Sequence, residues 1–326
     1  MKITVLGAGA WGTALARMLA SRQHEVALWD FFPETAEVIR QTGCNGRYLP
    51  GIELPPTLRP ETDAARAVDG AELIVVAAVS KAFRNVTGVL KGFDGVVVSV
   101  TKGIEFETGA TMTDILKQNA PRARIVAMSG PTLAMDVARG IPTAIVAASA
   151  DDRAAQTVQS LFHGPAFRVY TSNDVHGVEL GGALKNVIAI SAGVCDGLGF
   201  GDNSKAALVT RGVAEMRRLG VACGAKSETF TGLSGLGDLM VTCFSKLSRN
   251  RGFGERLGKG EKAAAIVASM TAVAEGYPTA RAARELARQK NVSAPIIDEV
   301  HAILYEGKNP QKALLDLTAR ESKAED

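Results

Sequence analysis

The chain has 326 residues, a hydrophobic share of 46% and a formal net charge of +3. This length is typical of about two domains, and the composition is that of an ordinary globular protein, which excludes a disordered or fibrous chain. Lysine and arginine residues are scattered along the sequence rather than gathered in the basic stripe that phosphate backbones require. We therefore expect no nucleic-acid partner.

The cysteines and the N-terminus indicate whether the protein binds metal, is secreted or enters a membrane. The four cysteines lie far apart and form no CxxC pair, so we expect free thiols and no metal site. The apolar N-terminus contains Arg17 and a glycine turn and lacks a signal-peptide cleavage site. No stretch approaches the roughly 18 apolar residues that a membrane helix needs. We expect a cytoplasmic protein without an integral membrane segment.

The first half of the chain alternates short, apolar, β-branched stretches with helical ones. Trp11–Ser21 is predicted to be a helix, and the proline- and glycine-rich segment Asn45–Pro60 a surface loop. The predicted strands are Lys2–Leu6, Glu25–Trp29, Glu72–Val79, Gly95–Val100, Arg124–Met128, Thr143–Ala148 and Phe167–Tyr170. Nearly continuous apolar strands between helices indicate an α/β fold, with a mostly parallel Rossmann-type sheet covered on both faces.

From about Asp174 the pattern becomes entirely helical. The predicted helices are Val178–Val194, Ser204–Leu219, Ala263–Ala268, Thr279–Gln289 and Ala294–Leu304. We therefore predict a dinucleotide-binding domain over residues 1–173 and an all-α substrate and catalytic domain over residues 174–326.

The sequence GAGAWG at residues 7–12 follows the first predicted strand and opens a helix, which is the context that a GxGxxG motif requires. Gly7 would permit the tight turn, Gly9 would let the backbone approach a pyrophosphate, and Gly12 would let the helix pack closely on the strand. The helix N-terminus would offer its N–H groups to the phosphates. This context disfavours the alternative of a purely structural glycine turn.

Asp30 ends the second predicted strand, near the position where a carboxylate binds the adenosine ribose hydroxyls. No lysine or arginine occurs from residue 23 to residue 39, so a 2′-phosphate would meet this carboxylate without compensation. We predict NAD as the cofactor, with NADP as the alternative.

Polar side chains follow two neighbouring predicted strands. TKGIE at residues 101–105 contains Lys102, and SGPT occupies residues 129–132. Because ligands bind at the carboxyl ends of the strands in an open parallel sheet, we predict a site there.

In the helical half, Lys185 lies among apolar residues in LGGALKNVIAI, residues 180–190. A lysine that reaches solvent is the competing interpretation. The two glycines before it favour the close approach of a ligand, and a buried lysine can exchange a proton with a carbonyl–alcohol couple.

Two further segments belong to the candidate site. GLSGLGD at residues 232–238 is predicted to be a flexible loop that ends in the carboxylate of Asp238. SRNR at residues 248–251 supplies guanidinium groups that suit phosphate, with a solvated basic turn as the alternative for Arg249.

These motifs, together with DGLGFGDNSKAAL at residues 196–208 and AEGYPTA at residues 274–280, resemble in their order the soluble bacterial-type glycerol-3-phosphate dehydrogenases (NAD(P)+). The resemblance extends from residue 2 to about residue 318. It implies that the protein reduces dihydroxyacetone phosphate, a small phosphorylated substrate, to sn-glycerol 3-phosphate for phospholipid synthesis. It also implies a homodimer.

The same resemblance implies individual roles. Lys185 would exchange the proton with the C2 oxygen of the substrate, and Lys102 would contact both substrate and cofactor. The other catalytic residues would be Asn186, Asp238 and Thr242. Substrate would also contact Gly130, Thr132, Asp238, Ser248, Arg249 and Asn250, with Arg249 and Asn250 on its phosphate. The cofactor would contact Gly7, Gly9, Ala10, Trp11, Gly12, Asp30, Lys102, Ala134, Arg249, Val273 and Glu275.

Three positions depart from the family pattern. Ala10 stands where many members carry a hydroxyl, Thr132 replaces the commoner serine, and Asp30 with Phe31 replaces the basic residue of NADP-preferring members.

Two other functions compete with this interpretation. Another β-hydroxyacid-type dehydrogenase would bind a carboxylate in place of the phosphate, and arginine binds both groups. A non-catalytic NAD(H) sensor on a retired dehydrogenase fold would be expected to lack the buried lysine, and the presence of Lys185 with Asn186 and Asp238 disfavours it.

Overall fold

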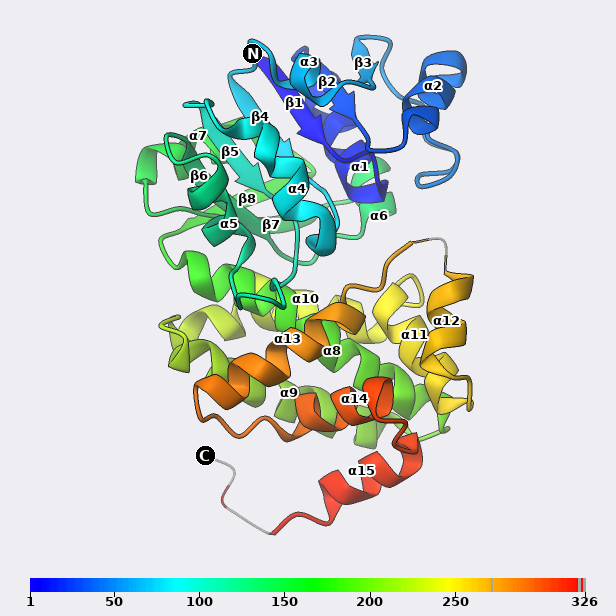
Figure 1. Ribbon diagram of the computed structural model, residues 1–326. Helices are drawn as coiled ribbons and strands as arrows, with labels where there is room; N and C mark the ends of the chain where they lie inside the picture. The colour runs from blue at the N-terminus through cyan, green and yellow to red at the C-terminus, as the bar shows by residue number, and fades with distance from the viewer. Residues whose placement is uncertain (271, 322–323, 325–326) are drawn as a thin grey trace. The chain divides into compact units, whose positions relative to one another are not determined.

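A computed structural model describes residues 1–270, 272–321 and 324 of the chain (Figure 1). The chain forms two compact units. Unit 1 comprises Met1–Lys102 and Ala110–Glu179, and unit 2 comprises Gly103–Gly109 and Leu180–Asp326.

Unit 1 is built on one eight-stranded sheet in the order β3-β2-β1-β4-β5-β6-β7-β8. The strands are β1 Lys2–Leu6, β2 Glu25–Trp29, β3 Leu58–Glu61, β4 Leu73–Val76, β5 Val96–Ser99, β6 Arg124–Ser129, β7 Thr143–Ala148 and β8 Phe167–Ser172. Every neighbouring pair is parallel except β6 and β7, which pair antiparallel. The predicted mostly parallel sheet is thus confirmed. Strands β2 and β3 are added on one side of β1 and β4 to β8 on the other, so the strand order reverses between β1 and β4, where such sheets bind their ligands.

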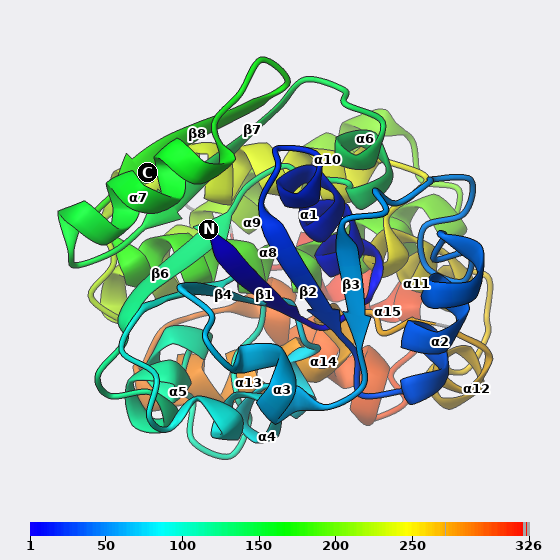
Figure 2. The same ribbon diagram turned by 90° about the horizontal axis from the view of Figure 1, so that it is seen from above.

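Helices cover both faces of this sheet (Figure 2). They are α1 Ala10–Ala20, α2 Pro33–Thr42, α3 Ala64–Val68, α4 Phe83–Thr87, α5 Met112–Asn119, α6 Ala134–Ala138 and α7 Asp152–Phe162, with short 3-10 turns at Ser80–Ala82 and Gly88–Leu90. Alternate residues of β4 enter different cores: Leu73 and Val75 pack with α1 and α7, whereas Ile74 and Val76 pack with α4 and α5. Burial on both faces explains why the strands are continuously apolar.

The prediction of a surface loop over Asn45–Pro60 is confirmed for residues 45–57, which form no helix or strand and are mostly exposed or partly exposed, but it is wrong at some positions. Asn45 and Leu49 are buried, and β3 begins at Leu58 inside the predicted loop. Leu49 packs with Ala14 of α1 and Ala138 of α6. A sequence pattern of isolated apolar residues between prolines and glycines does not reveal such a packing site. The predicted strand Glu72–Val79 is also shorter than expected, since β4 ends at Val76.

Unit 2 is helical. Helix α8 Val175–Gly197 begins in unit 1 and continues through unit 2. The other helices are α9 Asp202–Ala222, α10 Asp238–Phe244, α11 Arg249–Gly258, α12 Ala263–Ser269, α13 Gly276–Gln289, α14 Pro295–Tyr305 and α15 Pro310–Thr318, with short turns at Ser227–Thr231 and Leu233–Gly237. All five predicted helices are confirmed, with ends that differ by a few residues, and the described residues contain no strand after β8.

Helix α8 forms the centre of unit 2 and carries Lys185. Its most apolar window would suffice to cross a membrane by length and composition, and that window is entirely buried inside the protein. Helix α11 lies directly against it, because a Cβ atom on Gly254 would come within 1.9 Å of the Ile190 carbonyl oxygen. This close packing of backbones places the start of α11 beside the polar residues of α8.

Candidate active site

The glycine turn of unit 1 has the geometry that a dinucleotide requires. Gly7 has a φ of +114°, and a Cβ atom there would lie 2.7 Å from the Ala77 carbonyl oxygen after β4. A Cβ atom on Gly12 would lie 1.9 Å from the Gly7 carbonyl oxygen, whereas nothing lies within 4 Å of one on Gly9. Gly9 offers no side chain to cap α1, and the first turn has no acidic residue. The helix N-terminus can therefore receive a pyrophosphate.

Asp30 and Asn45 hold this turn in place. The Asp30 carboxylate accepts the backbone N–H of Ala8 at 2.7 Å and that of Phe32 at 3.0 Å. The Asn45 amide donates to the Ala8 carbonyl oxygen at 2.8 Å and to the Thr13 hydroxyl at 2.9 Å. Asp30 thus has a structural task in addition to the ribose contact predicted for it. Asn45 is not among the residues predicted for the site, because an isolated asparagine in a loop carries no distinguishing sequence signal.

Two predicted cofactor residues of unit 1 lie together. Trp11 of α1 and Ala134 of α6 pack against the same small apolar cluster as Ala14 and Leu49. Ala10 begins α1 next to the glycine turn.

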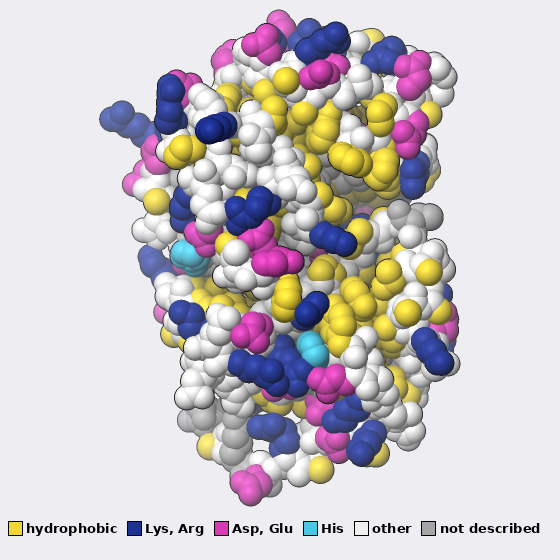
Figure 3. All heavy atoms as spheres, in the orientation of Figure 1, with side chains coloured by type: hydrophobic (Ala, Val, Ile, Leu, Met, Phe, Trp, Pro, Cys, Tyr) yellow, Lys and Arg dark blue, Asp and Glu magenta, His cyan; other side chains and the backbone are white. Residues whose placement is uncertain are grey.

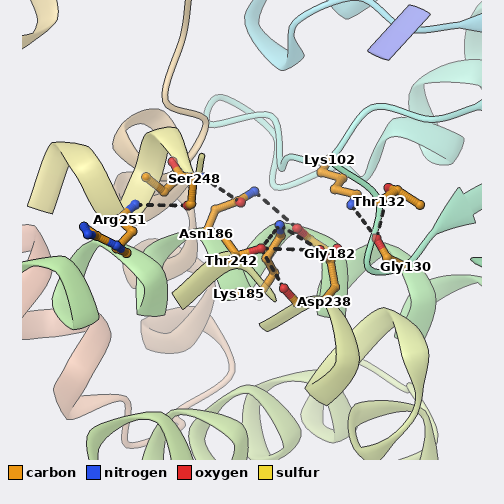
Figure 4. Close-up of polar contacts among 11 residues, drawn as sticks. Lys102, Gly130, Thr132, Gly182, Lys185, Asn186, Asp238, Thr242, Ser248 and Arg251 are labelled. Carbon is orange, nitrogen blue, oxygen red and sulfur yellow. Dashed lines mark hydrogen bonds and ion pairs between the residues drawn. The ribbon is translucent and has the colours of Figure 1, made fainter. Parts of the chain in front are cut away.

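The loops after β5 and β6 converge on one carbonyl group. Lys102 donates to the Gly130 carbonyl oxygen at 3.1 Å, and the Thr132 hydroxyl donates to the same oxygen at 3.1 Å (Figure 4). Because β5 and β6 are neighbouring parallel strands, their carboxyl ends lie at one edge of the sheet. The structure therefore brings Lys102, Gly130 and Thr132 together, as their positions after adjacent strands suggested.

In unit 2, Lys185 is buried and contacts two polar side chains of α10. Its ammonium lies 3.0 Å from the Asp238 carboxylate and 2.6 Å from the Thr242 hydroxyl (Figure 4). Lys185 is 6% exposed, which excludes a side chain that extends into solvent. Asp238 and Thr242 stand four residues apart on α10, so both face the same side of that helix and reach the lysine. The Thr242 hydroxyl in turn donates to the Asp238 carbonyl oxygen at 2.6 Å.

A second polar chain joins Asn186 to Asn250. The Asn250 amide nitrogen donates to the Asn186 side-chain oxygen at 2.8 Å, and its oxygen accepts the backbone N–H of Gly276 at 2.9 Å. Asn186 donates to the Gly182 carbonyl oxygen at 3.2 Å. These bonds connect α8, α11 and the start of α13, and they fix the orientation of both buried amides.

Two expectations about this region are wrong. Residues 232–238 are not a flexible loop, because Leu233–Gly237 forms a π-helical turn that leads directly into α10. Of the two glycines expected to let a ligand approach, Gly181 does not do so, since a Cβ atom there would lie 2.8 Å from the Ser234 carbonyl oxygen of that turn. The small residues of both segments serve close packing of backbones, and this packing places Asp238 beside Lys185.

The SRNR segment starts α11 rather than a solvated turn. Ser248 caps the helix by accepting the backbone N–H of Arg251 at 3.2 Å. Arg251 is buried and bonded to Glu255 at 2.6 Å and lies 3.4 Å from Asp196, so it serves the packing of unit 2. Arg249, in contrast, is exposed by surface area, although neighbouring atoms enclose its guanidinium enough that burial lowers its pKa. The two arginines, which the sequence does not distinguish, therefore differ in burial: Arg251 is enclosed and Arg249 is at the surface.

The cofactor residues predicted in unit 2 lie before α13. Val273 is exposed, and Glu275 is half-buried at the N-terminal boundary of that helix. Glu275 is close enough to Arg249 to interact with its charge.

Other reactive groups of unit 2 are not poised for chemistry. Burial raises the pKa of the Cys243 thiol to about 12 and that of Cys195 to about 11, so both stay protonated at neutral pH. Within the described residues no group of three His, Cys, Asp or Glu side chains could hold a metal ion. On the face drawn in Figure 3, Lys and Arg side chains are interspersed with Asp and Glu and form no continuous basic stripe.

Comparisons with known proteins identify the family and agree with the fold. A family model described as NAD-dependent glycerol-3-phosphate dehydrogenase N-terminus matches residues 2–155, and its C-terminus counterpart matches residues 174–315. Glycerol-3-phosphate dehydrogenase (NAD(P)+) of Trichlorobacter lovleyi is 49% identical over 331 residues, which cover 100% of this chain and 99% of the relative. A crystal structure of glycerol-3-phosphate dehydrogenase from Coxiella burnetii is 37% identical, with a TM-score of 0.95 and 98% of each chain covered. The Saccharomyces cerevisiae enzyme is 26% identical, with a TM-score of 0.82 over 98% of this chain and 99% of that one.

Proposed function

Because the chain belongs to the NAD-dependent glycerol-3-phosphate dehydrogenase family, we propose that it reduces dihydroxyacetone phosphate to sn-glycerol 3-phosphate with Lys185 as the acid and base. It is an NAD(P)-dependent oxidoreductase that acts on a CH–OH group. The observation that carries the proposed role is the buried ammonium of Lys185 between Asp238 and Thr242.

The proposed proton transfer follows from the chemistry of the couple. When bound, the reduced dinucleotide supplies a hydride to the C2 carbon of the ketone. The electron pair of the carbonyl then moves onto the C2 oxygen, and Lys185 donates a proton to that oxygen, which leaves a neutral amine that regains its proton from solvent. In the reverse direction Lys185 accepts the hydroxyl proton. Asp238 and Thr242 orient the ammonium, so that little reorganisation is needed at the moment of transfer.

We assign the substrate phosphate to Arg249 and Asn250, and the remaining substrate contacts to Lys102, Gly130, Thr132 and Ser248. A guanidinium binds phosphate with two parallel hydrogen bonds, and the Arg249 side chain is exposed. The Asn250 amide is already oriented by Asn186 and Gly276, so a phosphate would meet a preformed group. Binding energy from the phosphate, remote from the reacting carbon, would thereby lower the barrier of the hydride step.

The cofactor is an NAD(P) dinucleotide, and we assign its pyrophosphate to the Gly7–Gly12 turn. The open space at Gly9 and the uncapped start of α1 suit two phosphates. Ala10, Trp11, Lys102, Ala134, Arg249, Val273 and Glu275 are the further contacts in this proposal. We propose a preference for NADH, because Asp30 and its neighbours present no cation to a 2′-phosphate.

We further propose a cytoplasmic homodimer with no nucleic-acid partner. The support is the family itself, together with the general abundance of two-fold dimers. We also retain the division at residues 173 and 174 into a dinucleotide-binding domain and a substrate and catalytic domain as a proposal.

The test is to follow oxidation of NADH by its absorbance, with dihydroxyacetone phosphate as substrate. Wild type should turn over, and Lys185→Ala should lose at least about three orders of magnitude in kcat. Lys262→Ala, at an exposed lysine of the same unit, is the matched control and should match wild type. Activity with a β-keto acid but none with the phosphorylated ketone would favour the hydroxyacid alternative. NADH binding without turnover of either compound would favour the sensor.

A further inference from the structure

A cavity of about 1000 Å³ in unit 2 is lined by residues of helices α9 and α15. One face of α9 lines it, with Ala207, Arg211 and Arg218 among its residues. We call this cavity the α9 groove. Its volume is that of a small-molecule site. Lys185 and Arg249 are not among its lining residues, so it is separate from the proposed active site.

The wall of the α9 groove is predominantly apolar. Leu314, Leu315 and Leu317 belong to α15. Leu208 belongs to the first half of α9, and Phe200 lies just before that helix. Leu315 is 57% exposed and Phe200 is 37% exposed, although both are large apolar side chains. Such side chains gathered around a cavity are typical of a surface that an apolar ligand covers.

Three arginine side chains also line the α9 groove. Arg211 and Arg218 lie seven residues apart on α9 and so share one face of the helix, and Arg320 follows α15. Arg218 donates to the Ser293 carbonyl oxygen at 3.2 Å, which uses one of the five N–H groups of its guanidinium. In the part of the chain that the structure describes, Arg320 forms no ion pair or hydrogen bond. Arg218 and Arg320 can therefore bind an anionic group.

The acidic residue at the centre of the groove, Glu215, has partners of its own. Glu215 lies 4.0 Å from Arg218, but its carboxylate accepts the backbone N–H groups of Ile296 at 3.0 Å and Ile297 at 2.8 Å. It therefore serves the N-terminus of α14. Glu321 is the other carboxylate in the lining, so three arginines and two carboxylates leave one positive charge in excess.

The groove is also long. From Asn203 to Arg218 its α9 residues extend over about 22 Å at the helical rise of 1.5 Å per residue. We propose that the α9 groove binds a single-chain amphiphile, with its hydrocarbon chain along the leucines of α15 and its anionic head, a carboxylate or a phosphate monoester, on the arginines. This inference goes beyond the dehydrogenase function and does not depend on it.

Binding is tested by calorimetric titration of the whole protein with four probes of equal chain length, each below its micelle concentration. Dodecanoate and dodecyl phosphate carry the two anionic heads, dodecanol carries none, and dodecyltrimethylammonium is cationic. We expect one anionic probe per chain, bound at least about tenfold more tightly than the neutral and cationic probes. The anion that binds more tightly identifies the natural head group of the ligand, a fatty-acid carboxylate or a phosphate ester.

Two variant pairs locate the binding. Ala207→Trp places an indole inside the groove, whereas Ala206→Trp places the same indole on the exposed neighbour that does not line it. Arg320→Gln removes a groove cation, and Arg217→Gln removes an exposed cation of α9 outside it. The first member of each pair should weaken dodecanoate binding by about tenfold, and the second should leave it unchanged. None of the four residues belongs to the proposed catalytic machinery.

Several results would overturn the proposal. These are no binding of either anion up to its solubility limit, equal loss of binding in both members of a pair, or equal binding of all four probes. A change of oligomeric state would also overturn the proposal. If sedimentation shows that Ala207→Trp dissociates a dimer and Ala206→Trp does not, a second copy of the chain occupies the groove instead. Dehydrogenase activity that persists without amphiphile binding would leave the proposed function intact.

Discussion

Lys185 and Asp238 form a buried ion pair between α8 and α10, with the ammonium nitrogen 3.0 Å from the carboxylate oxygen. The pair keeps a charged lysine inside the protein at the place proposed for proton transfer. Because a buried charge without its partner is costly, both the position and the ionisation of Lys185 depend on Asp238.

Asp238→Asn should therefore lower kcat by about two orders of magnitude, because the amide keeps a hydrogen bond but removes the charge that holds the ammonium. Steady-state kinetics and the pH dependence of kcat are the measurements. A shifted pH profile together with a normal thermal unfolding midpoint indicates an effect on Lys185. An unchanged kcat would contradict the assigned role.

Thr242 offers a finer test of the same site. Thr242→Ser keeps the hydroxyl that lies 2.6 Å from the Lys185 ammonium, and Thr242→Val removes it at similar volume. We expect Thr242→Ser to stay within a few-fold of wild type and Thr242→Val to lose about tenfold or more in kcat, which matches one hydrogen bond to a charged group. Equal activity of the two variants would show that the hydroxyl is not needed.

Gly9 and Gly12 should respond differently to alanine. A Cβ atom on Gly12 would overlap the Gly7 carbonyl oxygen, so Gly12→Ala should lower the free energy of unfolding by about 1–3 kcal/mol or more. A Cβ atom on Gly9 meets nothing, so Gly9→Ala should unfold like wild type and bind NADH at least about tenfold more weakly. Denaturant unfolding and NADH titration separate the two effects. Normal NADH affinity in Gly9→Ala would exclude this turn as the pyrophosphate site.

Asp30 should matter for both the glycine turn and the choice of cofactor. Asp30→Ala removes the acceptor for the Ala8 and Phe32 N–H groups and should weaken NADH as well as NADPH. Asp30→Asn keeps an acceptor and removes the charge, so it should raise the kcat/KM with NADPH relative to that with NADH. Wild type should prefer NADH, and equal use of the two cofactors by wild type would refute the specificity argument.

Glu215 should make stability fall as the pH rises. Burial raises the pKa of this carboxyl from 4.5 to about 7 in the folded protein. A raised pKa means that the folded state holds the proton more tightly, so the stabilisation is present below pH 4.5 and is lost as the pH rises through about 7. Over this pH range, the shift in the pKa of Glu215 lowers the free energy of unfolding by about 3 kcal/mol in total.

Glu215→Gln provides the comparison, because its amide does not titrate and any cost of the substitution is the same at each pH. We expect the free energy of unfolding to decline less between pH values of about 5 and 8 in this variant than in wild type. Parallel pH dependences of the two proteins would show that Glu215 titrates normally.

Much of the fold was readable from local patterns. The glycine motif after the first strand, the continuous apolar strands and the change to helices after β8 predicted the sheet and the helical half, since each pattern depends on residues close in sequence. Local patterns also predicted two site residues. Lys185 is a cation within an apolar helix, and Lys102 is a polar residue directly after a buried strand. Helices α10, α11 and α15 were not predicted, since short helices carry little periodicity; α12, equally short, was predicted.

The sequence alone determined the type of fold, the glycine turn and the residue types available for a phosphorylated ketone and a dinucleotide. Only the tertiary structure decided which of these groups meet: that Asp238 and Thr242 hold Lys185, that Asn250 bonds to Asn186, that Asp30 and Asn45 brace the glycine turn, and that Arg251 is buried while Arg249 is exposed. The reason is physical. Propensity and periodicity act over a few residues, whereas these pairings join residues between 22 and 64 positions apart, and they form only when whole elements pack together.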